Sequence, residues 1–87
     1  LAGQFRQIVV STLAILAEAG AKPEHIVRMT WYVTDRAAYL DSLADLGATW
    51  RELIGRHYPA MAVVIVAGLV EPDALIEIET TAVVPCR

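Results

Sequence analysis

The sequence predicts an α+β domain in which helices pack on one face of a mixed β-sheet. Two segments repeat apolar residues at the three- and four-residue spacing of a helix, and strand-like segments alternate with them. The expected order is helix, strand, helix, strand, strand, without repeats or linkers. We expect residues 1–87 to form a single domain, near the lower size limit for a self-sufficient core.

The first half of the chain predicts one helix and one half-buried strand. Residues 5–19 carry an apolar stripe at helical spacing, and Gly20 follows as the expected helix stop. After a turn at residues 21–24, residues 27–34 alternate with the period of a strand. Asp35 is expected to cap or turn the chain behind this strand. The predicted helical stripe consists of Phe5, Ile8, Val9, Leu13 and Leu16, and the predicted buried strand face of Val27, Met29, Trp31 and Val33.

The second half predicts a helix followed by two strands. Residues 39–54 return to helical spacing, with a stripe formed by Leu40, Leu43, Leu46, Trp50, Leu53 and Ile54. Gly47 lies inside this helix and costs it roughly 1 kcal/mol relative to alanine, and Gly55 is expected to end it. The apolar run Met61–Val66 predicts a buried strand. After a connection at residues 68–74, Leu75–Val84 predicts a half-exposed strand that carries Glu77 and Glu79 on one face.

Composition and charge exclude several classes of function. Hydrophobic residues make up 56% of the chain, a surplus that we expect either a partner surface or further strands to cover. The net charge is −3 and no basic cluster is present, which argues against binding nucleic acid or an anionic membrane. No uncharged run reaches the roughly 18 residues of a membrane span, and the first residues do not resemble a signal peptide. A cytoplasmic protein is expected.

Individual residues give no sign of a metal or a nucleophilic triad. His25 and His57 have no cysteine or acidic residue at metal-ligand spacing, so no metal site is expected. No serine stands in a recognisable relation to either histidine. Trp31 and Trp50 lie on apolar stripes, which is typical of core or interface residues. Cys86 is expected to be an unremarkable thiol in the C-terminal tail.

The chain resembles, in order and spacing, five motifs of the RidA family, also called the YjgF or L-PSP endoribonuclease family, one of which is the Asn-x-x-Tyr motif of the family's second helix. Gln4-Phe5-Arg6-Gln7 is similar to the Gln-Thr-Arg-Gln start of the family's first helix. The segment from Ile26 to Asp35 resembles its Val-Val-Lys/Arg-x-Thr strand, which ends in aspartate. Pro59-Ala60-Met61 stands where the family has Pro-Ala-Arg, and Ile76–Ala82 matches its Val/Ile-Glu-Ile-Glu-x-x-Ala strand.

The resemblance implies the chorismate-mutase-like α+β fold with two helices on one face, assembled as a homotrimer around a small central barrel. Small-molecule ligands would bind in clefts between the subunits, and no cofactor is implied. Family members usually have two or three strands before the first helix, so we expect residues 1–87 to lack those strands. In the best-known branch, the arginine of Pro-Ala-Arg binds the substrate carboxylate. The reaction there is a deaminase-like hydrolysis of enamines and imines, such as 2-aminoacrylate, to a keto acid and ammonia.

The resemblance also assigns candidate site residues. Glu77 matches the glutamate that would hold and polarise the attacking water, and it is the candidate catalytic residue. Met61 stands in place of the arginine, and methionine forms neither a charge pair nor a strong hydrogen bond. The asparagine of the family's second helix falls on or near Gly47. The expected ligand-binding residues are Gly47, Trp50, Pro59, Ala60, Met61, Val63 and Glu77.

Three functional hypotheses follow. The first is a trimeric RidA-like protein that binds a small aromatic or acyl metabolite, for which a flexible thioether is well suited. The second is a true enamine or imine deaminase, a hydrolase in which Glu77 orients water. The third is a non-catalytic interaction protein that keeps only the trimeric scaffold. Simple core packing for Met61 and a solvated strand face for Glu77 and Glu79 are the plainer alternatives. Ribonuclease activity finds no support, because an acidic domain without aromatic platforms binds RNA poorly.

Overall fold

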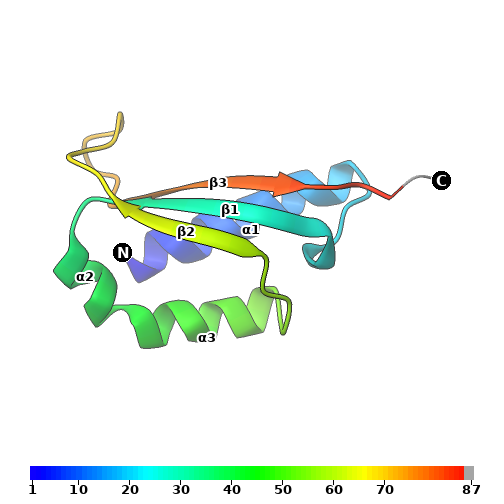
Figure 1. Ribbon diagram of the computed structural model, residues 1–87, viewed down its shortest axis with the longest axis horizontal. Coiled ribbons are helices and arrows are strands. Elements are labelled where there is room, and N and C mark those ends of the chain that lie inside the picture. The colour runs from blue at the N-terminus through cyan, green and yellow to red at the C-terminus, as the bar shows by residue number, and fades with distance from the viewer. Residues whose placement is uncertain (86–87) are drawn as a thin grey trace.

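Three strands form one mixed sheet in the computed structural model, which describes residues 1–85 (Figure 1). The strands are β1 (Ile26–Val33), β2 (Ala60–Ile65) and β3 (Ile76–Ala82), in the order β2-β1-β3. The central strand β1 pairs parallel with β2 and antiparallel with β3. The predicted α+β class, the mixed sheet and the order of the three strands along the chain are therefore confirmed.

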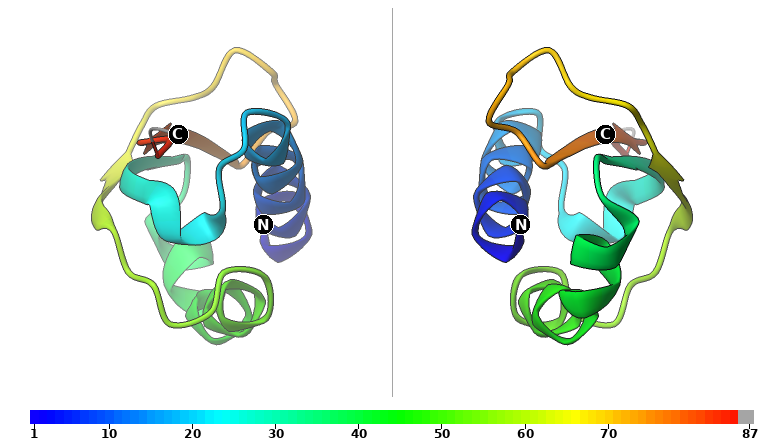
Figure 2. Two further views of the ribbon diagram at one scale, coloured as in Figure 1. Left: turned by 90° about the vertical axis from the view of Figure 1, so that its right-hand side faces the viewer. Right: turned by 90° about the vertical axis from the view of Figure 1, so that its left-hand side faces the viewer.

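Two long helices cover one face of this sheet. They are α1 (Ala2–Glu18) and α3 (Leu43–Leu53), and the end-on views of Figure 2 show both on the same side of the strands. A 3-10 turn, η1 (Pro23–His25), leads into β1. The core between helices and sheet is apolar and contains Phe5, Val9, Ile26, Met29, Trp31, Val33, Leu46, Trp50 and Ile76. Burial of these side chains is the main force that holds the helices against the sheet.

Both predicted glycine stops lie at helix ends. Gly20 has φ +79° directly after α1, and its N–H donates to the Ala17 carbonyl at 3.0 Å. The N–H of Ala21 donates to the Leu16 carbonyl at 2.9 Å, which completes a Schellman motif. Gly55 has φ +90° behind α3, a conformation that a side chain would strain.

The predicted helix 39–54 is broken in the structure. A short helix, α2 (Arg36–Asp41), begins earlier, because Asp35 caps it by accepting a hydrogen bond from the Ala38 N–H at 3.0 Å. The Ser42 hydroxyl donates to the Ala38 carbonyl at 2.8 Å, and α3 starts after it. The cap at Asp35 was predicted, whereas the break was not. With the helix divided, Leu40 and Leu43 are exposed rather than part of the buried stripe.

The strand β1 buries Ile26 instead of the predicted Val27. The register with β3 shifts between Ile26 and Arg28, so the strand contains an irregularity typical of a β-bulge. Val27 is 46% exposed as a result, while Met29, Trp31 and Val33 are buried as predicted.

The apolar strand β2 is exposed, which corrects the prediction of a buried strand. Along β2 only Val63 is half-buried, while Met61, Val64 and Ile65 are between 38% and 48% exposed. The reason is position: β2 lies at the sheet edge with β1 as its single strand neighbour within residues 1–85. A purely apolar run in sequence cannot distinguish a strand buried by its own chain from one left open at an edge.

Cys86 lies outside the described residues, so the expectation of a simple tail thiol stays a prediction. Across residues 1–85, the helices are all too short or too polar to span a membrane.

Candidate functional site

A row of aromatic rings runs from the core to the surface beside β2. The rings of Phe5 and Trp31 have centroids 4.8 Å apart, and those of Trp31 and Trp50 are 6.0 Å apart. Tyr58 completes the row by stacking on Trp50, with centroids 6.4 Å apart and an angle of 13° between the planes. Phe5, Trp31 and Trp50 are buried, whereas Tyr58 is 70% exposed, so the row ends at solvent.

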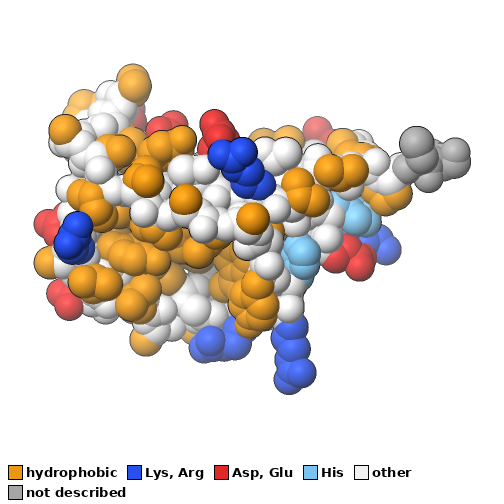
Figure 3. All heavy atoms as spheres, viewed as in Figure 1, with side chains coloured by type: hydrophobic (Ala, Val, Ile, Leu, Met, Phe, Trp, Pro, Cys, Tyr) orange, Lys and Arg blue, Asp and Glu red, His pale blue; other side chains and the backbone are white. Residues whose placement is uncertain are grey.

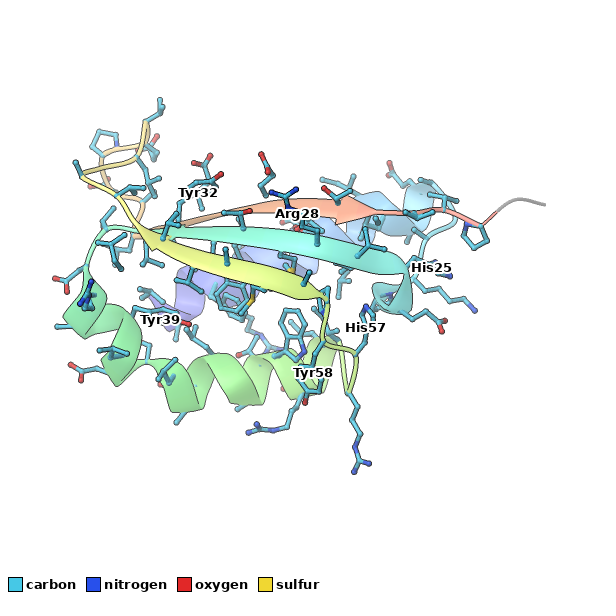
Figure 4. The ribbon with its side chains drawn as sticks, viewed as in Figure 1. His25, Arg28, Tyr32, Tyr39, His57 and Tyr58 are labelled. Atoms are coloured by element: carbon cyan, nitrogen blue, oxygen red, sulfur yellow. The ribbon has the colours of Figure 1, made fainter. Side chains whose placement is uncertain are left out.

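Backbone contacts fix the outer end of this row. The Trp50 indole N–H donates to the His57 carbonyl at 3.1 Å. The His57 ring donates from Nε2 to the Ile26 carbonyl at 2.6 Å, which ties the segment before β2 to the start of β1. Figure 4 shows His57 and Tyr58 in this segment, next to the end of α3. Hydrogen bonds to the neighbouring His57 therefore hold in place the backbone that carries the stacked Tyr58 ring.

An apolar pocket opens between the helices and β2. Its cavity volume is about 250 Å³, and Figure 3 shows hydrophobic side chains gathered in the hollow there. The lining residues come from β1, α2, α3 and β2 with its preceding segment: Trp31, Tyr39, Leu43, Leu46, Gly47, Trp50, Arg51, Tyr58, Pro59 and Met61. Aromatic and aliphatic groups surround the space, a composition typical of small-molecule sites. We call this space the α3–β2 pocket.

Four of the seven predicted ligand-binding residues meet in the α3–β2 pocket: Gly47, Trp50, Pro59 and Met61. Val63 pairs with Trp31 and packs against the core, and it does not line the cavity. Ala60 pairs with Arg28, on the sheet face opposite the helices.

Six further lining residues were not predicted as part of the site: Trp31, Tyr39, Leu43, Leu46, Arg51 and Tyr58. A usable signal existed for one of them. Arg51 follows Gly47 by one helical turn, a spacing that places both residues on one side of α3.

Glu77 lies on the opposite face of the sheet from Met61. Met61 pairs with Met29, whose side chain is buried among the helices, whereas Glu77 pairs with Tyr32. Paired residues share a face and neighbours along a strand alternate, so residues 29 and 32 of β1 point to opposite sides. Glu77 is exposed and lines a second hollow with Ile8, Ile76, Ile78 and the loop residues Leu69, Val70, Glu71 and Ala74. A single chain therefore does not bring Glu77 to the α3–β2 pocket.

The electrostatic character of the pocket rests on one side chain. Arg51 is the only charged residue among those that line it. Its Nη1 atom lies 3.3 Å from the point where a Cβ on Gly47 would stand, so the guanidinium folds back along α3 over the glycine. Among residues 1–85, no three histidine, cysteine or carboxylate side chains come together as a metal site requires.

An ion pair between Arg6 and Glu52 links α1 to α3 away from this pocket. The hydrogen bond from Arg6, aided by its charge, holds the pKa of the Glu52 carboxyl below its ordinary value. Both side chains are about half exposed, so the pair positions the helices only weakly.

Comparison with known proteins finds relatives along almost the whole chain. The family profile described as Endoribonuclease L-PSP matches residues 1–84. A RutC family protein from Pyrococcus abyssi is 34% identical over 79 residues, which span 91% of this chain and 58% of that protein. The chain thus spans less than two thirds of that relative's length.

Solved structures of similar proteins have the same fold as this chain. A Mycobacterium tuberculosis protein described as a member of the YjgF/YER057c/UK114 family superposes with a TM-score of 0.80 and 31% identity, over 95% of this chain and 67% of that chain. RidA from an Antarctic Psychrobacter bacterium superposes with a TM-score of 0.76 and 29% identity, over 92% of this chain and 61% of its own.

Proposed function

Because this chain belongs to the endoribonuclease L-PSP family, which includes the RidA proteins, we propose that it binds a small molecule in the α3–β2 pocket. The observation that carries the proposal is the row of aromatic side chains around an open cavity next to Met61. Apolar walls with few polar groups bind small ligands by removing apolar surface from water.

Met61 sets this pocket apart from the arginine-bearing pattern of the family. Its side chain lines the cavity and is 48% exposed, so it meets a ligand directly. A thioether offers polarisable contact to rings and acyl chains but no charge-assisted hydrogen bond to a carboxylate. We therefore propose that the ligand is an aromatic or acyl compound. Hydrolysis of 2-aminoacrylate is not expected to be the main activity.

The proposed working form is a homotrimer in which a neighbouring copy covers β2. Support comes from the exposed apolar side chains of Met61, Val64 and Ile65 on this edge strand. An unpaired edge with exposed apolar residues is a liability unless another chain covers it. Glu77 could meet a ligand in the α3–β2 pocket only if it came from another copy, because within one chain it faces away.

The test is a binding screen of keto acids, imines and aromatic acids, followed by calorimetry with any compound that stabilises the protein. Leu43→Trp would fill the pocket rim, and Leu40→Trp is the matched control. Both leucines are about half exposed, but only Leu43 lines the cavity. Binding that Leu43→Trp abolishes and Leu40→Trp retains supports the proposal. Binding that survives in both variants places the ligand elsewhere and refutes it.

A further inference from the structure

We infer that the α3–β2 pocket selects ring-bearing carboxylates and that Arg51, from α3, binds their anionic group. This inference rests on the proposed function, since it names the ligand class of the same pocket. Arg51 would thus determine ligand specificity. It lies outside the Pro59-Ala60-Met61 motif, on the wall of the pocket opposite Met61.

The charge on the pocket lining favours an anionic ligand. Arg51 is the single charged side chain there, and no carboxylate on the lining competes for it. Within residues 1–85 the one ion pair joins Arg6 to Glu52, so the Arg51 guanidinium keeps its donors available. A cation at the rim of an otherwise apolar cavity favours a ligand with an apolar body and an anionic end.

The glycine beneath the guanidinium gives Arg51 its place. Gly47 weakens α3, but its missing side chain leaves free space beside the Arg51 guanidinium. A Cβ at this position would stand 3.3 Å from Nη1, so the guanidinium would have to shift by a few tenths of an ångström. Because Gly47 has no positive φ, backbone conformation does not require glycine here. The helix backbone therefore does not explain a glycine at this position, whereas the room that it leaves for Arg51 does.

The shape and chemistry of the walls favour a ring. Trp50 and Tyr58 are stacked on one another, and with Met61 they present flat or soft apolar surface to the cavity. A volume of about 250 Å³ lies just below the roughly 300–1,000 Å³ of typical ligand pockets, so it suits one ring with a short acid. With the cation on α3, the carboxylate would point to the helix and the ring to β2.

The experiment compares phenylacetate with its neutral isostere phenylacetamide, using calorimetry on the wild type and on Arg51→Gln, Arg51→Lys and Arg56→Gln. Arg56 is exposed and does not line the pocket, so Arg56→Gln controls for overall charge. We expect the wild type to bind the acid about fivefold more tightly than the amide. Arg51→Gln should remove this preference, Arg51→Lys should retain part of it, and Arg56→Gln should leave it intact. Added salt should weaken the acid alone.

The outcomes separate the two proposals. If acid and amide bind equally to the wild type, and both are lost in Leu43→Trp, the pocket binds ligands but Arg51 does not select carboxylates, and this inference is wrong. It is equally wrong if Arg56→Gln lowers acid binding as much as Arg51→Gln does. If neither compound binds and the wider screen also finds no ligand for the pocket, the proposed function fails together with the inference. Melting curves confirm that each variant is folded.

Discussion

The guanidinium of Arg51 lies over Gly47, one helical turn earlier, with Nη1 at 3.3 Å from the position of a Cβ on that glycine. This relationship links the least helix-favouring residue of α3 to the only charge on the α3–β2 pocket. Glycine at position 47 therefore destabilises α3 but leaves room for the cation. Substituting Gly47 tests both the stability of the helix and the role of Arg51 in binding.

Gly47→Ala should stabilise the protein while weakening its preference for an acid. Alanine favours the helix by about 1 kcal/mol, which urea denaturation would detect. Its methyl group should push the Arg51 guanidinium aside by a few tenths of an ångström and lower phenylacetate affinity by at most about threefold, with phenylacetamide unaffected. Gly3→Ala in α1 is the control, because a Cβ there meets nothing within 4 Å. Unchanged phenylacetate affinity in a stabilised Gly47→Ala variant would show that Arg51 does not depend on the space beside Gly47.

Met61→Arg should bring the strand closer to the family pattern and create activity on 2-aminoacrylate. The wild type is expected to hydrolyse this substrate negligibly, and the variant to gain about tenfold through a charge-assisted contact to the carboxylate. Ammonia release measures the rate, and Met61→Leu, which adds no charge, should gain nothing. Wild-type turnover equal to that of an arginine-bearing relative would contradict this prediction, because the cation would then be dispensable.

Ile65→Glu should dissociate the proposed homotrimer. Ile65 is 45% exposed on β2, so a glutamate is tolerated in the free chain but would be buried without a partner in an interface. Light scattering at micromolar concentration should report a trimer for the wild type and a smaller species for the variant. Ile15→Glu is the control, since Ile15 is 67% exposed on α1, away from β2. A monomeric wild type would refute the assembly.

Glu52→Gln should make stability less dependent on acid pH. The folded pKa of Glu52 lies below its unfolded value, chiefly through the hydrogen bond from Arg6. The resulting stabilisation is fully present above the unfolded pKa and is lost as pH falls through the folded pKa. The difference in melting temperature between wild type and variant should therefore shrink below about pH 4. In an Arg6→Gln background the same substitution should have no such effect, and a persisting difference would point to another partner.

The features that were predicted correctly depend on local signals. Gly20 and Asp35 act through hydrogen bonds to residues within five positions, so the chain alone specifies them. β1 buries Ile26 where Val27 was predicted to be buried, because its register with β3 shifts there, and β3 is remote in sequence. The exposure of β2 likewise depends on sheet order.

The candidate site was predictable only in part, for a similar reason. Gly47 and Met61 were found through motif positions, and both line the pocket. Tyr39 and Arg51 belong to no motif and reach the cavity only because α2 and α3 fold beneath β2. Glu77 was assigned by its motif, and only the strand register shows that it faces away from Met61.

The aromatic row gives the protein an intrinsic optical probe. Trp31 and Trp50 are the only tryptophans in the sequence, and both line the pocket while belonging to the core. Their emission should respond to a bound ligand by quenching or a change of intensity, and to denaturation by a red shift. Trp31 sits among apolar groups and Trp50 donates to a carbonyl, so Trp31→Phe and Trp50→Phe would assign the two signals. Ligand titration and unfolding can thus be followed on the same unlabelled sample.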